Sequence, residues 1–318
     1  MRSKYIADFV ENDTIIEVFL IESRSLGTTR AGKPYISLNL RDKTSTISAK
    51  VWDDADVIYK QLGDSEFVEI NGSVESYQNK LQLKVASIKA LKPDRIDMSD
   101  FIATTEGDVE EMFDEVEKIC STVRNKHLHK LLMKFLSDDE FAAKLKKAPA
   151  AKMIHHSYIG GLLEHTLSVM RTCDKLAGHY TNLDRDLVLT GAFFHDIGKI
   201  DEIDTTKAFN YTRDGSLIGH IVMGYRMVDE AIGDIQDFPE KLRVEIGHII
   251  LSHQGKKEFD SPVVPMFPEA ILVHYADDLD TKIFVSQKAI EANDSTDTEF
   301  TDRIWELGTR VYKGVKKE

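Results

Sequence analysis

The sequence predicts a multidomain protein of the β plus all-α class, in which an N-terminal five-stranded barrel precedes an all-helical bundle. Its 318 residues are enough for two domains. Between residues 14 and 91, apolar and polar residues alternate with a period of two, as in half-buried strands. From residue 109 onward, apolar residues recur at the three- and four-residue spacing of helices. Residues 93–108 lose this periodicity and gather Pro, Asp, Ser, Thr and Gly, which is typical of a linker.

The N-terminal domain, residues 1–92, is expected to contain a helix between its third and fourth strands. The alternation is clearest over residues 35–41 and 46–52, and Leu81, Leu83 and Val85 are expected to point inward from the last strand. Three strands, a helix and two strands are typical of a small closed barrel of the OB type. The expected strands cover residues 14–22, 35–41, 46–52, 67–76 and 81–91, and the helix covers 53–62.

One outer face of this barrel is predicted to bind nucleic acid. Tyr35, Arg41, Lys50 and Trp52 are expected to share it, next to a glycine-containing loop that carries Lys33. Aromatic and basic side chains on one barrel face form a stacking platform for single strands. The alternative is that Tyr35 and Trp52 cover a core or a domain contact, and the residue types alone favour neither interpretation.

The strongest chemical signal is the stretch from residue 191 to 199. An apolar run ends there in His195 and Asp196, and Gly198 and Lys199 follow within one turn. Burying an imidazole beside a carboxylate is costly unless each has a partner, and a divalent cation can serve both. The alternative is a core helix whose polar end reaches solvent.

Four further residues lie in similar settings, and they are His165, His220, His253 and Asp277. Each alone is weak evidence, because a lone histidine beside apolar residues is usually a hydrogen-bonded core residue. Together with the pair at 195–196 they place six imidazole or carboxylate groups on five helices, and converging side chains of a bundle can build a metal site. The expected helices cover 109–125, 127–136, 138–146, 161–177, 184–195, 217–232, 239–252, 268–292 and 300–315.

These six residues match the metal-ligand order of the HD-domain phosphohydrolases, with spacings of 30, 25, 33 and 24 residues. The stretch SRSLGTTRAGKPYISLNLRD, followed by ISAKVWD, resembles OB-fold domains of the anticodon-binding sort. With the segment 148–165 that leads to the first ligand, nearly the whole chain resembles the YhaM-type 3′→5′ exoribonucleases. One departure is Gln254 after His253, where members often carry two adjacent histidines.

The resemblance implies an HD-type domain over residues 109–318, with its metal-site core at about 160–285, and two divalent ions. His165, His195, Asp277 and one oxygen of Asp196 would hold the first ion. The other oxygen of Asp196, with His220 and His253, would hold the second. Imidazole and carboxylate ligands without thiolates favour Mn²⁺, with Fe²⁺, Co²⁺ or Mg²⁺ as alternatives.

The implied activity is hydrolysis of single-stranded RNA from its 3′ end to nucleoside 5′-monophosphates, by a hydroxide that bridges the two metals. Single-stranded DNA is a further candidate substrate. Asp196 and Lys199 are the expected catalytic residues, since the ammonium of Lys199 could approach a phosphate oxygen; its alternative is an exposed lysine at a helix end. His155 and His156 are expected either to contact the substrate phosphate or to orient the following turn.

Composition restricts the setting of this activity. The net charge is −13, and residues 1–95 carry 14 basic and 14 acidic side chains whereas the remainder carries 27 and 40. The charge therefore argues against bulk attraction of nucleic acid, and strand capture is expected on the neutral barrel. No apolar run reaches bilayer length, no signal peptide is visible, and only two cysteines are present, so we expect a cytoplasmic protein with no membrane partner. A monomer and a homo-oligomer are both compatible with the sequence.

Two other functions stay open at this point. The first is hydrolysis of a small nucleotide, with the barrel as a regulatory or oligomerisation module. The second is an inactive single-strand-binding adaptor, although the complete ligand set argues against lost activity.

Overall fold

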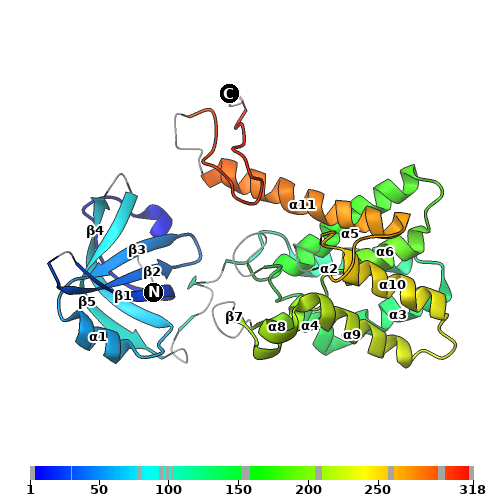
Figure 1. The fold of residues 1–318 in the computed structure, drawn as a ribbon, viewed down its shortest axis with the longest axis horizontal. Coiled ribbons are helices and arrows are strands. Elements are labelled where there is room, and N and C mark those ends of the chain that lie inside the picture. Colours follow the sequence, from blue (N-terminus) through cyan, green and yellow to red (C-terminus); the bar gives the residue numbers. More distant parts are fainter. Residues whose placement is uncertain are drawn as a thin grey trace. The chain divides into compact units, whose positions relative to one another are not determined.

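The computed structural model divides the chain into two compact units, residues 1–104 and 105–318, each with its own hydrophobic core (Figure 1). It describes residues 4–29, 31–77, 80–92, 96–97, 100–101, 103–151, 158–204, 210–256, 261–292 and 298–314. Among these residues, no helix has both the length and the apolar character needed to cross a bilayer.

The first unit is a closed five-stranded barrel, which confirms the predicted OB-type architecture. Its strands are β1 (Thr14–Thr28), β2 (Pro34–Arg41), β3 (Thr46–Val51), β4 (Phe67–Tyr77) and β5 (Lys80–Leu91). They pair in the order β1-β2-β3-β5-β4, and only the β3–β5 contact is parallel among the described pairings. A short 3-10 helix, η1 (Ile6–Asp8), precedes β1, and helix α1 (Ala55–Leu62) lies between β3 and β4 as expected.

Alternation along the strands places the side chains as predicted, with one exception. Ile36, Leu38 and Leu40 of β2 are fully buried, and so is Leu83 of β5. Leu81 was expected inside but is 39% exposed. The parallel contact of β5 with β3 begins only at Gln82, so Leu81 lies on the β4–β5 hairpin beyond the closed part of the barrel.

The described part of the expected linker, residues 93–108, packs on one unit or the other. The Tyr5 hydroxyl donates to Asp100 at 2.7 Å, and the Phe101 ring lies 5.2 Å from that of Phe67 in the barrel. The backbone N–H of Thr105 donates to the carbonyl of Ile159 in the second unit. The boundary between the two units therefore lies within a few residues of Thr104.

The second unit is helical, and α5, α6, α10 and α11 pack together around its core. Its helices are α2 (Val109–Ser121), α3 (Lys126–Leu136), α4 (Asp139–Leu145), α5 (Gly161–His179), α6 (Arg185–Phe194), α7 (Lys199–Glu202), α8 (Arg213–Ile218), α9 (His220–Gly233), α10 (Glu240–Ser252) and α11 (Pro268–Ala292). A two-stranded ribbon, β6 (Ile203–Asp204) and β7 (Asn210–Tyr211), lies between α7 and α8.

Two expected helices differ from the structure. The single helix predicted over residues 217–232 is interrupted at Gly219, whose φ of +78° falls outside the helical region, so α8 and α9 are separate. The helix predicted over residues 300–315 is wrong: the described residues there form isolated bridges between Phe300 and Tyr312 and between Ile304 and Thr309. Gly308, with a φ of +65°, turns the chain between them, and this left-handed conformation breaks a helical pattern.

Candidate metal centre

Six side chains from five separate parts of the helical unit meet in its core, and we refer to them as the metal centre. His165 lies on α5 and Asp277 on α11, while His220 opens α9. His195 and Asp196 directly follow α6, and His253 directly follows α10. The set comprises His165, His195, Asp196, His220, His253 and Asp277.

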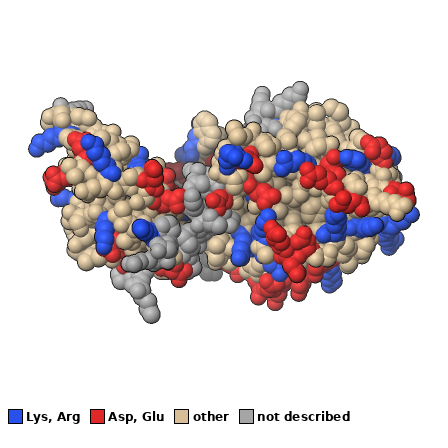
Figure 2. Space-filling view, turned by 90° about the horizontal axis from the view of Figure 1, so that it is seen from below, with Lys and Arg blue, Asp and Glu red and all other residues tan. Residues whose placement is uncertain are grey.

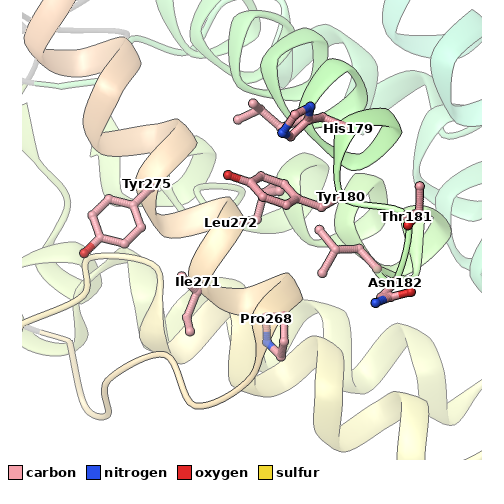
Figure 3. A pocket seen from close by; sticks show the side chains of 10 residues that line it. His179, Tyr180, Thr181, Asn182, Pro268, Ile271, Leu272 and Tyr275 are labelled. Atoms are coloured by element: carbon pink, nitrogen blue, oxygen red, sulfur yellow. The ribbon is translucent and has the colours of Figure 1, made fainter.

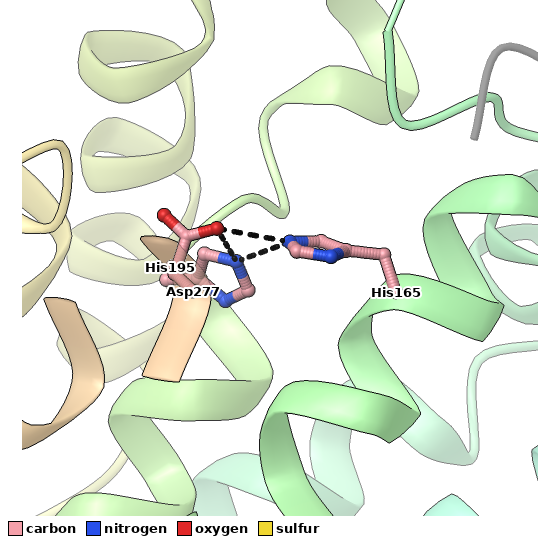
Figure 4. A group of neighbouring side chains, drawn as sticks. All are labelled: His165, His195 and Asp277. Atoms are coloured by element: carbon pink, nitrogen blue, oxygen red, sulfur yellow. Dashed lines mark hydrogen bonds and ion pairs between the residues drawn. The ribbon is translucent and has the colours of Figure 1, made fainter. Parts of the chain in front are cut away.

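Three of these side chains form one group of potential ligands, in which His165 faces His195 and Asp277 (Figure 4). Nε2 of His165 lies 3.2 Å from Nε2 of His195 and 3.2 Å from Oδ1 of Asp277. Nε2 of His195 lies 4.0 Å from the same carboxylate oxygen. All three side chains are almost completely buried.

Asp196 connects this group to a second one. Its Oδ2 lies 3.6 Å from Nε2 of His165 and 3.5 Å from Nε2 of His195. Its Oδ1 lies 3.4 Å from Nε2 of His220 and 3.3 Å from Nε2 of His253. One carboxylate therefore presents one oxygen to each group, which is the arrangement of a ligand shared by two ions.

The other ring nitrogen of each histidine contacts an acceptor, so all four rings turn Nε2 toward the centre. Nδ1 of His195 donates to the Ala192 carbonyl, and Nδ1 of His253 donates to the Ile250 carbonyl. The remaining two rings contact carboxylates: His165 contacts Asp280 at 2.7 Å, and His220 contacts Glu202 at 3.2 Å. Such contacts fix the tautomer and orientation of metal-binding histidines.

Two buried atoms of the centre have no hydrogen-bond partner, and they are Asp196 Oδ1 and His220 Nε2. Leaving a buried carboxylate oxygen and an imidazole nitrogen unpaired is costly, and a divalent cation between them removes that cost. The donor set of imidazoles and carboxylates suits first-row divalent metals. The residues of the centre therefore fit divalent metal ions.

Several side chains of the centre have shifted pKa values when no metal is bound. Burial lowers the pKa of His195 to about 4. Burial opposes charge on His165 as well, but hydrogen bonds to Asp277 and Asp280 outweigh it and raise the pKa of His165 to about 9. For Asp196 the burial effect is outweighed by the positive charge of Lys199 and the nearby imidazoles, which hold its pKa well below the usual value. The carboxylates of Asp196 and Asp277 are thus ionised at neutral pH.

The start of α7 brings a cation and α9 close to Asp196. The ammonium of Lys199 is buried and donates to Oδ2 of Asp196 at 2.6 Å, so Lys199 is not an exposed lysine at a helix end. Gly198 lies against the first turn of α9, and a Cβ atom there would overlap the carbonyl oxygen of His220. The glycine therefore permits the close approach that brings His220 to Asp196.

On the barrel, three of the predicted nucleic-acid contacts lie together, and we refer to Tyr35, Lys50 and Trp52 as the stacking platform. The rings of Tyr35 and Trp52 are 5.2 Å apart at 32°, and Trp52 is 48% exposed. The Lys50 ammonium lies 5.1 Å from the centre of the Tyr35 ring and donates to Ser37. Trp52 thus offers its ring to solvent, and Tyr35 and Lys50 are half-buried beside it.

The other predicted contacts are placed differently. Arg41 lies at the opposite end of β2 from Tyr35, with its guanidinium 3.3 Å from Glu22. Lys33 is exposed in the turn before β2, where its backbone N–H donates to Thr29. His155 and His156 lie outside the described residues. The structure thus gathers three of the five barrel residues and leaves Arg41 paired elsewhere.

Two carboxylates around the metal centre were missed in the sequence. Asp280 contacts His165 and also accepts a hydrogen bond from the Ser168 hydroxyl, while Glu202 accepts from both the backbone and the ring of His220. Asp280 lies three residues after Asp277 on α11, so the helical period could have placed it beside the same site. Glu202 gives no comparable signal, because acidic residues after Lys199 are typical of a solvated loop.

Charge is distributed unequally over the surface. On the face shown in Figure 2, acidic side chains form a dense group on the helical unit, whereas both signs are mixed over the barrel. This distribution agrees with the neutral charge count of residues 1–95 and the acidic count of the remainder.

Comparison with known families assigns both units. The HD domain family matches residues 162–282, and the family described as an OB-fold nucleic acid binding domain matches residues 8–91. The HD match spans the whole metal centre, from His165 to Asp277.

Three curated relatives match along nearly their whole length, and each is named 3′-5′ exoribonuclease YhaM. The protein of Geobacillus sp. (strain WCH70) is 32% identical over 311 residues, which cover 98% of this chain and 94% of the relative. The Bacillus velezensis protein is 31% identical over 301 residues, with 94% of each chain covered. The Listeria welshimeri protein is 31% identical over 313 residues, with 97% of each covered.

Proposed function

This chain belongs to the family of the 3′-5′ exoribonucleases named YhaM, and from that premise we propose that it hydrolyses single-stranded RNA from the 3′ end in a metal-dependent reaction. The carrying observation is Asp196, whose two oxygens face two separate groups of potential ligands. We assign strand binding to the barrel, residues 1–92, and hydrolysis to the helical domain, residues 109–318. The free, buried cysteines Cys120 and Cys173 fit the reducing cytoplasm.

We propose two divalent ions, one on each side of Asp196, with Mn²⁺ as the preferred metal. His165, His195 and Asp277 would hold one ion and His220 and His253 the other. When bound, such ions supply Lewis acidity, activate water and neutralise charge on the phosphodiester. Since these ligands include only two carboxylates, Asp196 and Asp277, two dications leave a net positive centre that suits a phosphate.

The chain's own residues orient this centre. The Nδ1 contacts hold each imidazole in one tautomer, with Nε2 directed inward. The buried ammonium of Lys199 balances the charge of Asp196 and lies where it can stabilise negative charge that develops on a phosphate oxygen. Burial of the ligands limits the access of bulk water and strengthens these interactions.

The stacking platform supports capture of a single strand by its bases. Base stacking on aromatic rings is tolerant of sequence and of the sugar, so we also propose that single-stranded DNA can enter the same site. Because the barrel is neutral and the helical domain acidic, the affinity for a long strand should depend mainly on base stacking, with limited salt dependence.

Digestion of a 5′-labelled single-stranded RNA with Mn²⁺ tests the proposal. We expect a ladder that shortens from the 3′ side, nucleoside 5′-monophosphates as products, and no cleavage in EDTA. If the protein hydrolyses a cyclic or free nucleotide but leaves the oligonucleotide uncut, it is instead a small-nucleotide phosphodiesterase. Binding of RNA without any cleavage by the metal-loaded protein would indicate an adaptor.

A further inference from the structure

A cleft of about 570 Å³ borders the metal centre on the side of His220. It is lined by α8, the start of α9, Tyr211 of β7 and Glu202, and α8 and β7 lie side by side in Figure 1. Glu202 and His220 belong to both the cleft and the surroundings of the centre. The cleft is therefore continuous with the proposed reaction site.

Among the six side chains of the metal centre, that of His220 is the most exposed. The side chain of His220 is 18% exposed, whereas that of Asp277 is 9% exposed and the other four ligands are at most 2% exposed. A phosphodiester bound beside His220 would have one of its two nucleosides next to this cleft, because His220 lines both the centre and the cleft.

Four exposed large apolar side chains line the cleft. Leu217 is 78% exposed and Tyr211 49%, and Ile218 and Val222 are also exposed. These side chains surround the break at Gly219, which separates α8 from α9. A cluster of exposed large apolar side chains beside a reaction site marks a binding surface for an apolar part of the ligand.

We propose that this cleft, the terminal-base cleft, receives the 3′-terminal nucleobase of the RNA. The inference rests on the exoribonuclease function proposed above and adds the site at which the released 3′-terminal nucleotide is bound. Its volume falls within the range of sites that hold a small ligand such as one nucleotide. Aromatic and aliphatic side chains offer flat contacts to any base, so the cleft would accept all four.

The polar groups of the cleft also fit a nucleobase better than a phosphate group other than the one at the metal centre. No lysine or arginine lines it among the described residues, and its one carboxylate, Glu202, is already engaged by the backbone and ring of His220. A phosphate there would lack a cationic partner and would lie near that carboxylate. A neutral base meets neither penalty.

A second cleft in the helical unit provides a matched comparison. It measures about 700 Å³ and lies between the end of α5, the loop that follows it and the start of α11, with Tyr180 and Tyr275 at its sides (Figure 3). Tyr180 is 54% exposed, close to the value for Tyr211. None of its lining residues belongs to the metal centre, so Tyr180 is a control for the loss of an exposed tyrosine.

The test is a cycle that combines a protein change with a substrate change. Mn²⁺-loaded wild type, Tyr211→Ala, Leu217→Ala and Tyr180→Ala are each assayed on an RNA oligonucleotide and on the same oligonucleotide with an abasic 3′-terminal nucleotide. Removing the base should lower the wild-type kcat/KM about tenfold, as for one stacked base. Tyr211→Ala and Leu217→Ala should each lower kcat/KM on intact RNA by a similar factor. On the abasic strand, the same substitutions should change kcat/KM little.

An equilibrium measurement supports the kinetic one. A fluorescent 2-aminopurine at the 3′ terminus should be quenched on binding to the full chain without metal, and Tyr211→Ala should reduce this quenching whereas Tyr180→Ala should not. The mutations are at exposed sites, and an unchanged melting temperature confirms that each variant is folded.

The possible outcomes separate the two levels of the argument. Suppose that wild type shortens RNA from the 3′ end, but that each protein substitution lowers kcat/KM by the same factor on intact and abasic RNA. The assignment of the terminal-base cleft is then wrong, and the exoribonuclease proposal stands. If wild type leaves intact RNA uncut, the function and the cleft assignment both fall.

Discussion

The stacking platform and the metal centre are built from parts of the chain at very different distances. Tyr35, Lys50 and Trp52 lie within 18 residues of one another: Tyr35 and Lys50 are on two strands that pair directly, and Trp52 follows the second strand. His165 and Asp277 are 112 residues apart and come from helices α5 and α11. The platform therefore depends on local strand pairing, whereas the centre exists only when the helical unit is completely folded.

The two regions also differ in their exposure to solvent. Trp52 is half exposed, so its face is available to a strand without rearrangement of the barrel. The ligands of the centre are nearly all buried, which strengthens their electrostatic interactions. We infer that the platform contributes modest, tolerant binding and that the centre contributes the reaction. The following predictions test this division in order of decreasing effect.

Replacing the shared carboxylate should separate the two regions most strongly. Asp196→Asn keeps the size of the side chain but removes the charge that faces both ligand groups. We expect RNA cleavage to fall by about 1000-fold or more, since loss of about 4 kcal/mol of transition-state stabilisation has that effect. Binding of a 20-nucleotide RNA, measured by fluorescence anisotropy, should be nearly unchanged. Normal cleavage by this variant would contradict the site assignment.

Asp280→Asn should weaken metal binding without removing a ligand. Asp280 contacts Nδ1 of His165, and removal of such a partner typically costs about 10- to 100-fold in metal affinity. Isothermal titration with Mn²⁺ measures the effect. The control is Asp278→Asn on the same helix, because the side chain of Asp278 is 38% exposed and contacts Lys282. Equal affinities for the two variants would show that Asp280 has no positioning role.

Removing the platform should affect long substrates and spare short ones. Tyr35→Ala combined with Trp52→Ala should weaken binding of a long single strand by roughly 10-fold or more, given the usual worth of base stacking on a ring. Hydrolysis of a small chromogenic phosphodiester should stay within about twofold. Equal losses on both substrates would point to a structural role for the two rings.

Metal binding should release protons at neutral pH. Despite burial, Asp277 and Asp280 raise the pKa of His165 to about 9, so this imidazole is charged at pH 7.5 and must lose its proton to bind a metal. Burial also opposes charge on His253, but Asp196 raises the pKa of that imidazole. Titrations with Mn²⁺ in buffers of different ionisation enthalpy should show about one proton released from His165 at pH 7.5 and less above pH 9. Identical heats in all buffers would contradict this protonation state.

The same raised pKa has a consequence for stability without metal. A folded-state pKa of about 9, compared with the ordinary histidine value of 6.5, stabilises the metal-free fold fully below about pH 6.5. This contribution is lost as the pH rises from about 6.5 to 9. The melting temperature of the metal-free protein should fall over that interval, and His165→Gln should remove part of the dependence.

The elements that the sequence predicted well are those specified by local periodicity. The alternation of residues 35–41 and 46–52 fixed which side chains face outward, and the barrel followed from the number and order of the strands. The prediction failed where local pattern and tertiary context disagree. Residues 300–315 carry apolar spacing compatible with a helix, but Gly308 in the left-handed region turns the chain.

The candidate metal ligands could be chosen from the sequence, but their surroundings could not. Histidines and aspartates beside apolar residues were visible one by one, and the family order selected among eleven histidines. The contacts of Glu202 with His220 and of Asp280 with His165 join residues 18 and 115 positions apart. No local pattern reports such contacts, because they depend on how the helices pack.

The most direct test of the account is a Mn²⁺ titration of the full chain followed by electron paramagnetic resonance. Two ions that share the Asp196 carboxylate should bind at two equivalents per chain and give the signature of a magnetically coupled pair, which Asp196→Ala should abolish. Saturation at one equivalent with an isolated Mn²⁺ signal would contradict the account, as would a coupled signal that survives in Asp196→Ala.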